Sequence, residues 1–195
     1  MIGAELPEGA TPIDPDDAAG LRLPHITTRG ELDRWESENI LKALAWLERI
    51  RPKDIINAAF IRRLHQKMFG DVWKWAGRYR TSAKNIGVPW HQVPVDVDSL
   101  CRDVPVWIAS SGESPDEMAV RLHHRLVWIH PFSNGNGRHA RLMTDLFMEN
   151  ISKGLRFTWG GADLTRHDDF RKAYIDALRE ADEGDLKPLL KFARS

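Results

Sequence analysis

Residues 130–141 carry the side chains best suited to chemistry, and they read His-Pro-Phe-Ser-Asn-Gly-Asn-Gly-Arg-His-Ala-Arg. Gly135 and Gly137 permit backbone conformations with positive φ, so that successive N–H groups can point into one concavity. Arg138 and Arg141 project from the same helical turn, and two guanidinium groups beside such a concavity suit a di- or triphosphate. His130 can take a proton from a hydroxyl that attacks a bound phosphate. The run therefore predicts a phosphate site with a general base beside it.

Two helices are needed to position these residues. Apolar residues recur with one-sided helical spacing over 116–129, and Ser114 with Glu117 forms a capping box that opens this helix. Pro131 closes it, because the residue before a proline is pushed out of helical geometry. A second helical pattern runs from about residue 138 to 148. The sequence therefore predicts a helix, a tight turn and a second helix.

The same residues resemble the signature of the Fic (Fic/Doc) family, His-Pro-Phe-x-(Asp/Glu)-Gly-Asn-Gly-Arg-x-x-Arg. They depart from it at Asn134, where the family usually has an acidic residue. The resemblance extends to residues 69–80, 85–88 and 181–186. Together with residues 27–32, it is closest to the subgroup called mobile mystery protein B.

The helical patterns and this resemblance together predict a mainly α-helical, single-domain bundle with a small β-hairpin flap. We expect the Fic domain to span residues 28–195 and to follow an irregular arm, residues 1–27, that is rich in Pro, Asp, Gly and Ala. A further apolar pattern covers residues 98–108, where Pro105 is expected to break or kink a helix.

The resemblance implies a protein adenylyltransferase, which transfers AMP from ATP to the hydroxyl of a Ser, Thr or Tyr side chain on a target protein. His130 is then the general base, and Phe132 is an apolar anchor for the turn. Mg²⁺ is implied near Asn134, which supplies no negative charge. The residues expected to bind the nucleotide are Ser133, Gly135, Asn136, Gly137, Arg138 and Arg141.

Two other functions stay open. A Doc-like phosphotransferase binds ATP the other way round and delivers the γ phosphate, but that subgroup has Lys where this chain has Gly137. A catalytically weakened, nucleotide-binding regulatory protein is the other alternative, and Asn134 is the residue that motivates it.

Residues 87–94 predict a short extended hairpin, because two prolines confine this stretch to an edge or to turns. Its edge is expected to hold a target peptide by strand addition, as the resemblance also implies. The alternative is an ordinary connector with Trp90 packed against the protein. The expected target-docking residues are Val88, Pro89, Trp90, His91, Gln92 and Val93.

Inhibition within the chain is a hypothesis for Glu31 and Glu38, each of which matches part of the family's inhibitory helix motif. The other interpretation of Glu31 is a capping box with Thr28. The resemblance also implies a helix-turn-helix companion, mobile mystery protein A, which is a candidate for inhibition by a partner.

Composition indicates a globular protein of 195 residues. Lys plus Arg and Asp plus Glu both number 28, so no overall field attracts nucleic acid or an anionic membrane. The single cysteine, Cys101, fits a reducing compartment, and no stretch is apolar for the length of a membrane span, so we expect a cytoplasmic protein. His123 and His124 are adjacent and point in different directions, which argues against a zinc site.

Overall fold

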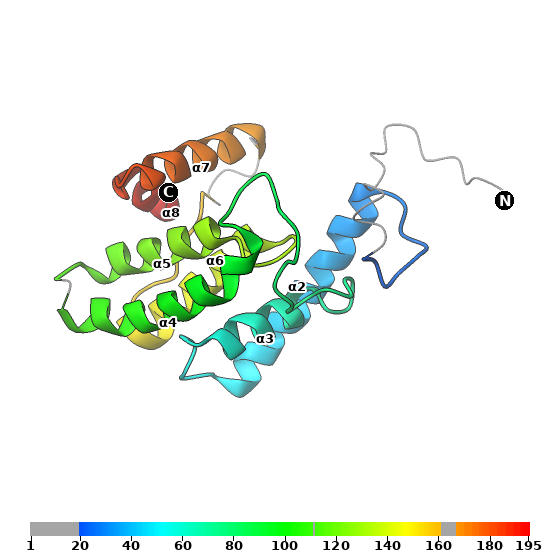
Figure 1. The fold of residues 1–195 in the computed structure, drawn as a ribbon, viewed down its shortest axis with the longest axis horizontal. Helices are drawn as coiled ribbons and strands as arrows, with labels where there is room; N and C mark the ends of the chain where they lie inside the picture. The colour runs from blue at the N-terminus through cyan, green and yellow to red at the C-terminus, as the bar shows by residue number, and fades with distance from the viewer. Residues whose placement is uncertain (1–19, 111, 161–166) are drawn as a thin grey trace. The chain divides into compact units, whose positions relative to one another are not determined.

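The computed structural model describes residues 20–110, 112–160 and 167–195, so most of the expected arm of residues 1–27 lies outside it. The described residues form helices joined by loops, with one isolated antiparallel bridge between Leu21 and Trp73 (Figure 1). The prediction of a mainly α-helical protein is confirmed. The chain divides into two compact units, which are described separately.

The first unit contains α2 (Arg29–Ile50) and α3 (Ala58–Phe69). The capping box predicted at the start of α2 is present, since the Thr28 hydroxyl accepts from the Glu31 N–H and the Glu31 carboxylate accepts from the Thr28 N–H. The buried amide of Asn39 on α2 donates to the Lys67 carbonyl at 2.9 Å and so joins α2 to α3.

The second unit consists of residues 53–58 and 79–195, and it holds the signature residues. Its helical elements are η1 (Trp90–Gln92), α4 (Val93–Ser110), α5 (Pro115–Ile129), α6 (Asn136–Phe147), the π-helical turn η2 (Met148–Ser152), α7 (His167–Asp182) and α8 (Lys187–Arg194). Helix α5 packs against α4, α6, α7 and α8, so it forms the centre of this unit (Figure 1). Its Leu122, Leu126 and Ile129 are almost fully buried. Because α5 is packed against four helices, it is a rigid support for His130 and the turn that follows it.

Helix α5 begins and ends where the sequence predicts. Ser114 and Glu117 form the reciprocal capping box, and Pro115 occupies the first turn. The helix ends at His130, whose backbone is left-handed with φ 52° and ψ 60° and precedes Pro131. Helix α6 starts two residues earlier than predicted, at Asn136.

Two features predicted for the segment before α5, a hairpin and a helix break, are absent from its described residues. The expected hairpin at residues 87–94 is instead the short helix η1 followed directly by α4. Pro94 lies in the first turn of α4, where the absent N–H has no intrahelical partner to lose. Pro105 lies inside α4 without ending it, because Val97, Leu100 and Val104 are fully buried on the same helix and hold it in place.

Candidate active site

The turn between α5 and α6 is closed by one buried side chain. The Asn136 amide accepts from the Phe132 N–H at 2.9 Å and donates to the Phe132 carbonyl at 2.8 Å. Phe132 is itself 0% exposed and packs its ring on Tyr79 and His139, so its expected role as an apolar anchor is confirmed. Because the Asn136 amide is committed to the turn, Asn136 can offer a phosphate its backbone N–H.

The two glycines of the turn differ in conformation. Gly135 is left-handed, with φ 77°, and ends the turn one residue before α6. Gly137 lies within the first turn of α6, so the expectation of positive φ at Gly137 is wrong. The concavity therefore consists of one left-handed glycine and the N-terminus of a helix, where the first N–H groups lack carbonyl partners and favour an anion.

His130 caps the C-terminus of α5 beside this concavity. Burial first, and then the positive charge of Arg80, lower the pKa of His130 to about 4. Its Nδ1 atom is buried and makes no hydrogen bond of good geometry within the described residues, although the Val127 carbonyl lies near enough to oppose the pKa shift. The imidazole is therefore neutral near pH 7, as a general base must be.

The second signature arginine is held between two aromatic rings. The guanidinium carbon of Arg141 lies 4.7 Å from the ring centre of Tyr174 and 5.6 Å from that of Trp159. The Trp159 indole is fixed by donating to Asp145 at 3.1 Å, and the Tyr174 hydroxyl pairs with His123 at 2.9 Å. Planar cation–π contacts of this kind orient a guanidinium group, and among the described residues no carboxylate forms an ion pair with Arg141.

Ser133 lies on the turn, and Gly137 and Arg138 lie at the start of α6. All three are partly exposed. The side-chain oxygen Oδ1 of Asn134 accepts from the Gly135 N–H at 2.6 Å, which stabilises the turn. Among the described residues, no group of three or more His, Cys, Asp or Glu side chains could hold a metal ion. Mg²⁺ sites in proteins use carboxylate oxygens together with substrate phosphates, and the neutral amide of Asn134 supplies no negative charge, so the turn does not fit a metal held by the protein alone.

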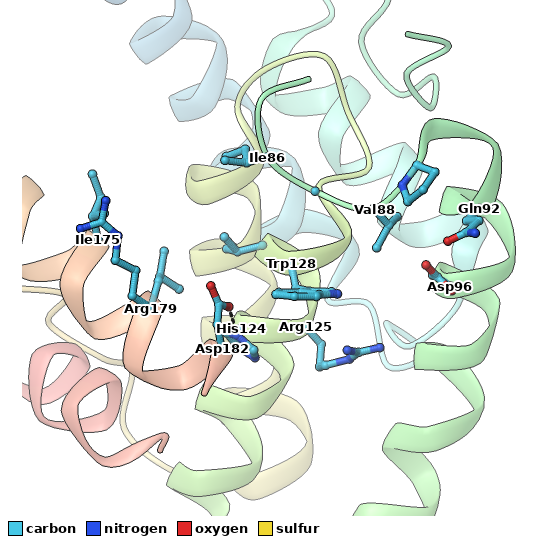
Figure 2. Close-up of a pocket in the computed structure, with 14 residues that line it drawn as sticks. Ile86, Val88, Gln92, Asp96, His124, Arg125, Trp128, Ile175, Arg179 and Asp182 are labelled. Carbon is cyan, nitrogen blue, oxygen red and sulfur yellow. Dashed lines mark hydrogen bonds and ion pairs between the residues drawn. The ribbon is translucent and has the colours of Figure 1, made fainter. Parts of the chain in front are cut away.

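A pocket of about 850 Å³ is lined by three segments of the second unit (Figure 2). One of its lining residues, Gly87, lies against His130. Ile86, Gly87 and Val88 lie on one side, α5 supplies Val127 and Trp128, and α7 supplies Ile175 and Leu178. These residues make the walls largely apolar. The polar lining residues are Gln92, Asp96, His124, Arg125, Arg179 and Asp182, and His124 pairs with Asp182 at 2.7 Å.

Comparison with known proteins agrees with this geometry. Residues 55–148 match the model of the Fic/DOC family. This part of the chain is similar to the Fic/DOC family domain. The chain is 29% identical over 150 residues to the protein adenylyltransferase Fic of Nematostella vectensis. The aligned region covers 73% of this chain and 33% of that protein. The chain thus spans about a third of the length of the curated relatives it matches.

Two solved structures share the Fic fold of this chain. Fic-1 (residues 134–508) from C. elegans matches with a TM-score of 0.65 and 26% identity over 82% of this chain and 47% of that one. The BepC protein of Bartonella tribocorum, solved with bound AMPPNP, matches with a TM-score of 0.68 and 18% identity over 97% of this chain and 93% of that one. These matches confirm the helical Fic fold that the signature predicts.

The segment expected to dock a target in this Fic domain divides into two parts. Val88, Pro89 and Gln92 line the pocket, while Trp90 is 44% exposed and meets His91 edge to face. Val93 is 0% exposed because it is the first residue of α4 and packs inward, so the expectation that Val93 contacts a target is wrong. With η1 in place of a strand, docking on this segment would use side chains and loop backbone.

Glu31 and Glu38 both lie on α2 of the first unit. The Glu31 carboxylate accepts from the N–H groups of Thr27 and Thr28, each at 3.1 Å, and the exposed Glu38 approaches Arg34 at 3.8 Å. The capping interpretation of Glu31 is therefore confirmed. Inhibition by either carboxylate remains a prediction.

Several residues that shape the Fic site were not identified from the sequence. Arg80 contacts the end of α5, Tyr174 and Trp159 hold Arg141, and His124 pairs with Asp182 across the pocket. Arg80 ends the stretch of residues 69–80 that resembles the family, which is the one signal that points to it. The other contacts join helices far apart in sequence and leave no local pattern. Every helix of the described residues is too short or too polar to cross a membrane.

Proposed function

We propose that this protein is a protein adenylyltransferase that transfers AMP from ATP to a Ser, Thr or Tyr hydroxyl of a target protein. The observation that carries the proposal is the position of a neutral, half-buried His130 at the end of α5, one tight turn before the start of α6, which bears Arg138 and Arg141. The names of the curated relatives support it, since they are called protein adenylyltransferases.

In the proposed reaction, His130 takes the proton from the target hydroxyl as its oxygen bonds to the α phosphorus. The bond from that phosphorus to the oxygen bridging the α and β phosphates breaks, and pyrophosphate leaves. The backbone N–H groups at the start of α6 and the charges of Arg138 and Arg141 stabilise the negative charge on the phosphates. Because phosphoryl-type transfer relies on positioning and charge, loss of either arginine should cost more rate than loss of a packing residue.

The pocket beside His130 is the proposed site of the adenine base. Helix α7 connects it to the phosphate site, because Tyr174 lies over Arg141 while Ile175 and Leu178, on the same helix, line the pocket. A largely apolar pocket with a few polar groups is typical of small-molecule sites. Mg²⁺ is proposed to arrive with ATP as part of the substrate, bound chiefly by the phosphate oxygens.

The proposal includes a target protein as partner, a companion like mobile mystery protein A as regulator, and a cytoplasmic location. Inhibition within the chain by Glu31 or Glu38 remains part of it. Removing residues 1–31, or replacing Glu31 with Gly, should raise self-modification if α2 inhibits. Unchanged self-modification in both variants would exclude inhibition through Glu31.

Incubation with ATP labelled separately at the α and γ positions tests the function. Label transferred from the α position supports adenylyl transfer, and label from the γ position supports a Doc-like phosphotransferase. No transfer by protein that still binds ATP supports a nucleotide-binding regulator. His130→Ala is the matched control, since it should abolish transfer while ATP binding is retained; near-native transfer by this variant would refute the assigned base.

A further inference from the structure

The side chain of Arg80 is buried against the end of α5. It is 3% exposed, and its Nε atom donates to the His130 carbonyl at 2.6 Å. Its Nη2 atom donates to the carbonyl of Val88 and approaches that of Ile129 at 3.4 Å, while Nη1 donates to the Ser82 carbonyl at 3.2 Å. One guanidinium group therefore joins the end of α5 to both ends of residues 82–88.

The partners of Arg80 are backbone carbonyls. In the described part of the chain no carboxylate forms an ion pair with it, and the carbonyls of Ile129 and His130 are among those that a helix end leaves unpaired. The backbone N–H of Arg80 adds a bond to the Pro131 carbonyl at 3.0 Å. Several donors in one rigid plane are a property of arginine, and the ammonium group of lysine cannot reproduce it.

Gly87 brings residues 82–88 into close contact with the same place. Its φ is +96°, and a Cβ atom built there would lie 2.5 Å from the Cβ of His130 and 3.0 Å from Nη2 of Arg80. The chain passes His130 so closely that a side chain at residue 87 has no room. The segment and the proposed base are thus in direct contact, and Arg80 bonds to both.

We propose that Arg80 is a positioning residue, which holds His130 and residues 82–88 as one rigid unit and so aligns a target bound along that segment with the imidazole. The catalytic consequence rests on the proposed function, whereas the holding role does not. The charges that act most strongly on His130 are those of Arg80 and the exposed Lys84, and both lower its pKa. Arg80 therefore also helps to keep His130 neutral.

Two substitutions separate the geometry of Arg80 from its charge. Arg80→Lys keeps the charge and loses the planar set of donors, whereas Arg80→Gln loses both. Lys84→Met is the matched control, because Lys84 contributes charge near His130 but none of the carbonyl contacts described for Arg80. All three are measured in the full chain, with circular dichroism to confirm folding.

NMR relaxation of the backbone amides measures the holding role without any need for activity. Both Arg80 variants should lower the order parameters of residues 82–88 from rigid values of about 0.85 to about 0.6 or below, with little change in the core of α5, while Lys84→Met should match the wild type. NMR titration should place the His130 pKa higher in Arg80→Gln than in Arg80→Lys. In transfer assays, Arg80→Lys should lose up to about 10²-fold in kcat/KM for the target protein, with little change in KM for ATP.

Native order parameters across residues 82–88 in a folded Arg80→Lys variant would overturn the proposal. If Arg80→Gln does not fold, Gly87→Ala replaces it, because the added methyl group must displace His130 or the Arg80 guanidinium. Unchanged order parameters and an unchanged His130 titration in Gly87→Ala would count equally against the role. A wild-type protein without transfer activity would refute the proposed function alone, since the order parameters and the titration still decide whether Arg80 holds the segment.

Discussion

Replacement of Asn136 by Ala gives a direct test of how the turn before α6 is built. The Asn136 side chain is 4% exposed and is bonded to both the N–H and the carbonyl of Phe132, which is 0% exposed. The substitution leaves two buried backbone groups without partners, at about 1–3 kcal/mol each, so the free energy of unfolding should fall by about 2–6 kcal/mol. Such a loss is a large part of the roughly 5–15 kcal/mol by which domains are stable.

Urea unfolding followed by tryptophan fluorescence measures this loss. Asn134→Ala is the matched control in the same turn, because Asn134 is partly exposed and the bonds described for the buried backbone groups of Phe132 are made by Asn136. Loss of the Asn134 bond from the Gly135 N–H should cost about 0.5–1.5 kcal/mol. An Asn136→Ala protein within about 1 kcal/mol of the wild type, or equal to Asn134→Ala, would show that Asn136 does not close the turn.

Three further predictions concern the same turn. Gly135→Ala should destabilise the protein by about 1–2 kcal/mol, because the φ of Gly135 is 77°. Gly137→Ala should leave stability within about 0.5 kcal/mol and weaken ATP binding, because Gly137 is already helical. Equal unfolding curves for the two variants would contradict this difference. The pH profile of kcat/KM for ATP, which reports the protein before the nucleotide binds, should have its acid limb near the His130 pKa of about 4, since only the neutral imidazole is active. An acid limb near 6.5 would contradict the burial argument. Asn134→Asp should lower the Mg²⁺ concentration for half-maximal transfer, and identical Mg²⁺ titrations would show that residue 134 does not touch the metal.

The parts of the fold that the sequence predicted are those specified by local chemistry. Helix α5 illustrates this, because its capping box, its proline in the first turn and its apolar spacing all lie within the helix or beside it. The same holds for Thr28 and Glu31 at the start of α2. Each signal acts over three or four residues, the range over which sequence patterns are reliable.

The errors arose where tertiary packing overrides a local preference. Two prolines predicted an edge strand at residues 87–94, yet Pro94 is equally well suited to the first turn of α4. Pro105 should cost a helix interior about 3 kcal/mol, and the burial of Val97, Leu100 and Val104 on the same helix offsets that cost. The residues next to either proline in the sequence do not indicate which surface of the helix is buried.

The site was predicted through its signature, and its supporting contacts were not. His130, Gly135 and the two arginines are adjacent in sequence, so their type and spacing already indicate a phosphate site. Arg80 instead reaches the His130 carbonyl from 50 residues away, and Tyr174 reaches His123 from 51 residues away. Contacts of this length depend on how α5 and α7 pack, which periodicity alone does not determine.

The long-range contacts of Arg80 and Arg141 also determine whether the positive charges of the proposed site are neutralised. Arg80 is met by neutral carbonyls and Arg141 by aromatic rings, so neither positive charge is neutralised by a carboxylate in the described residues. Asn134 adds no negative charge where the family's signature has an acid. A bound triphosphate would supply the missing negative charge, and an anion near an imidazole favours its protonated form and raises its pKa. His130 should therefore be a weak base in the free protein and a stronger one once the nucleotide is bound, which would couple proton transfer to the presence of substrate.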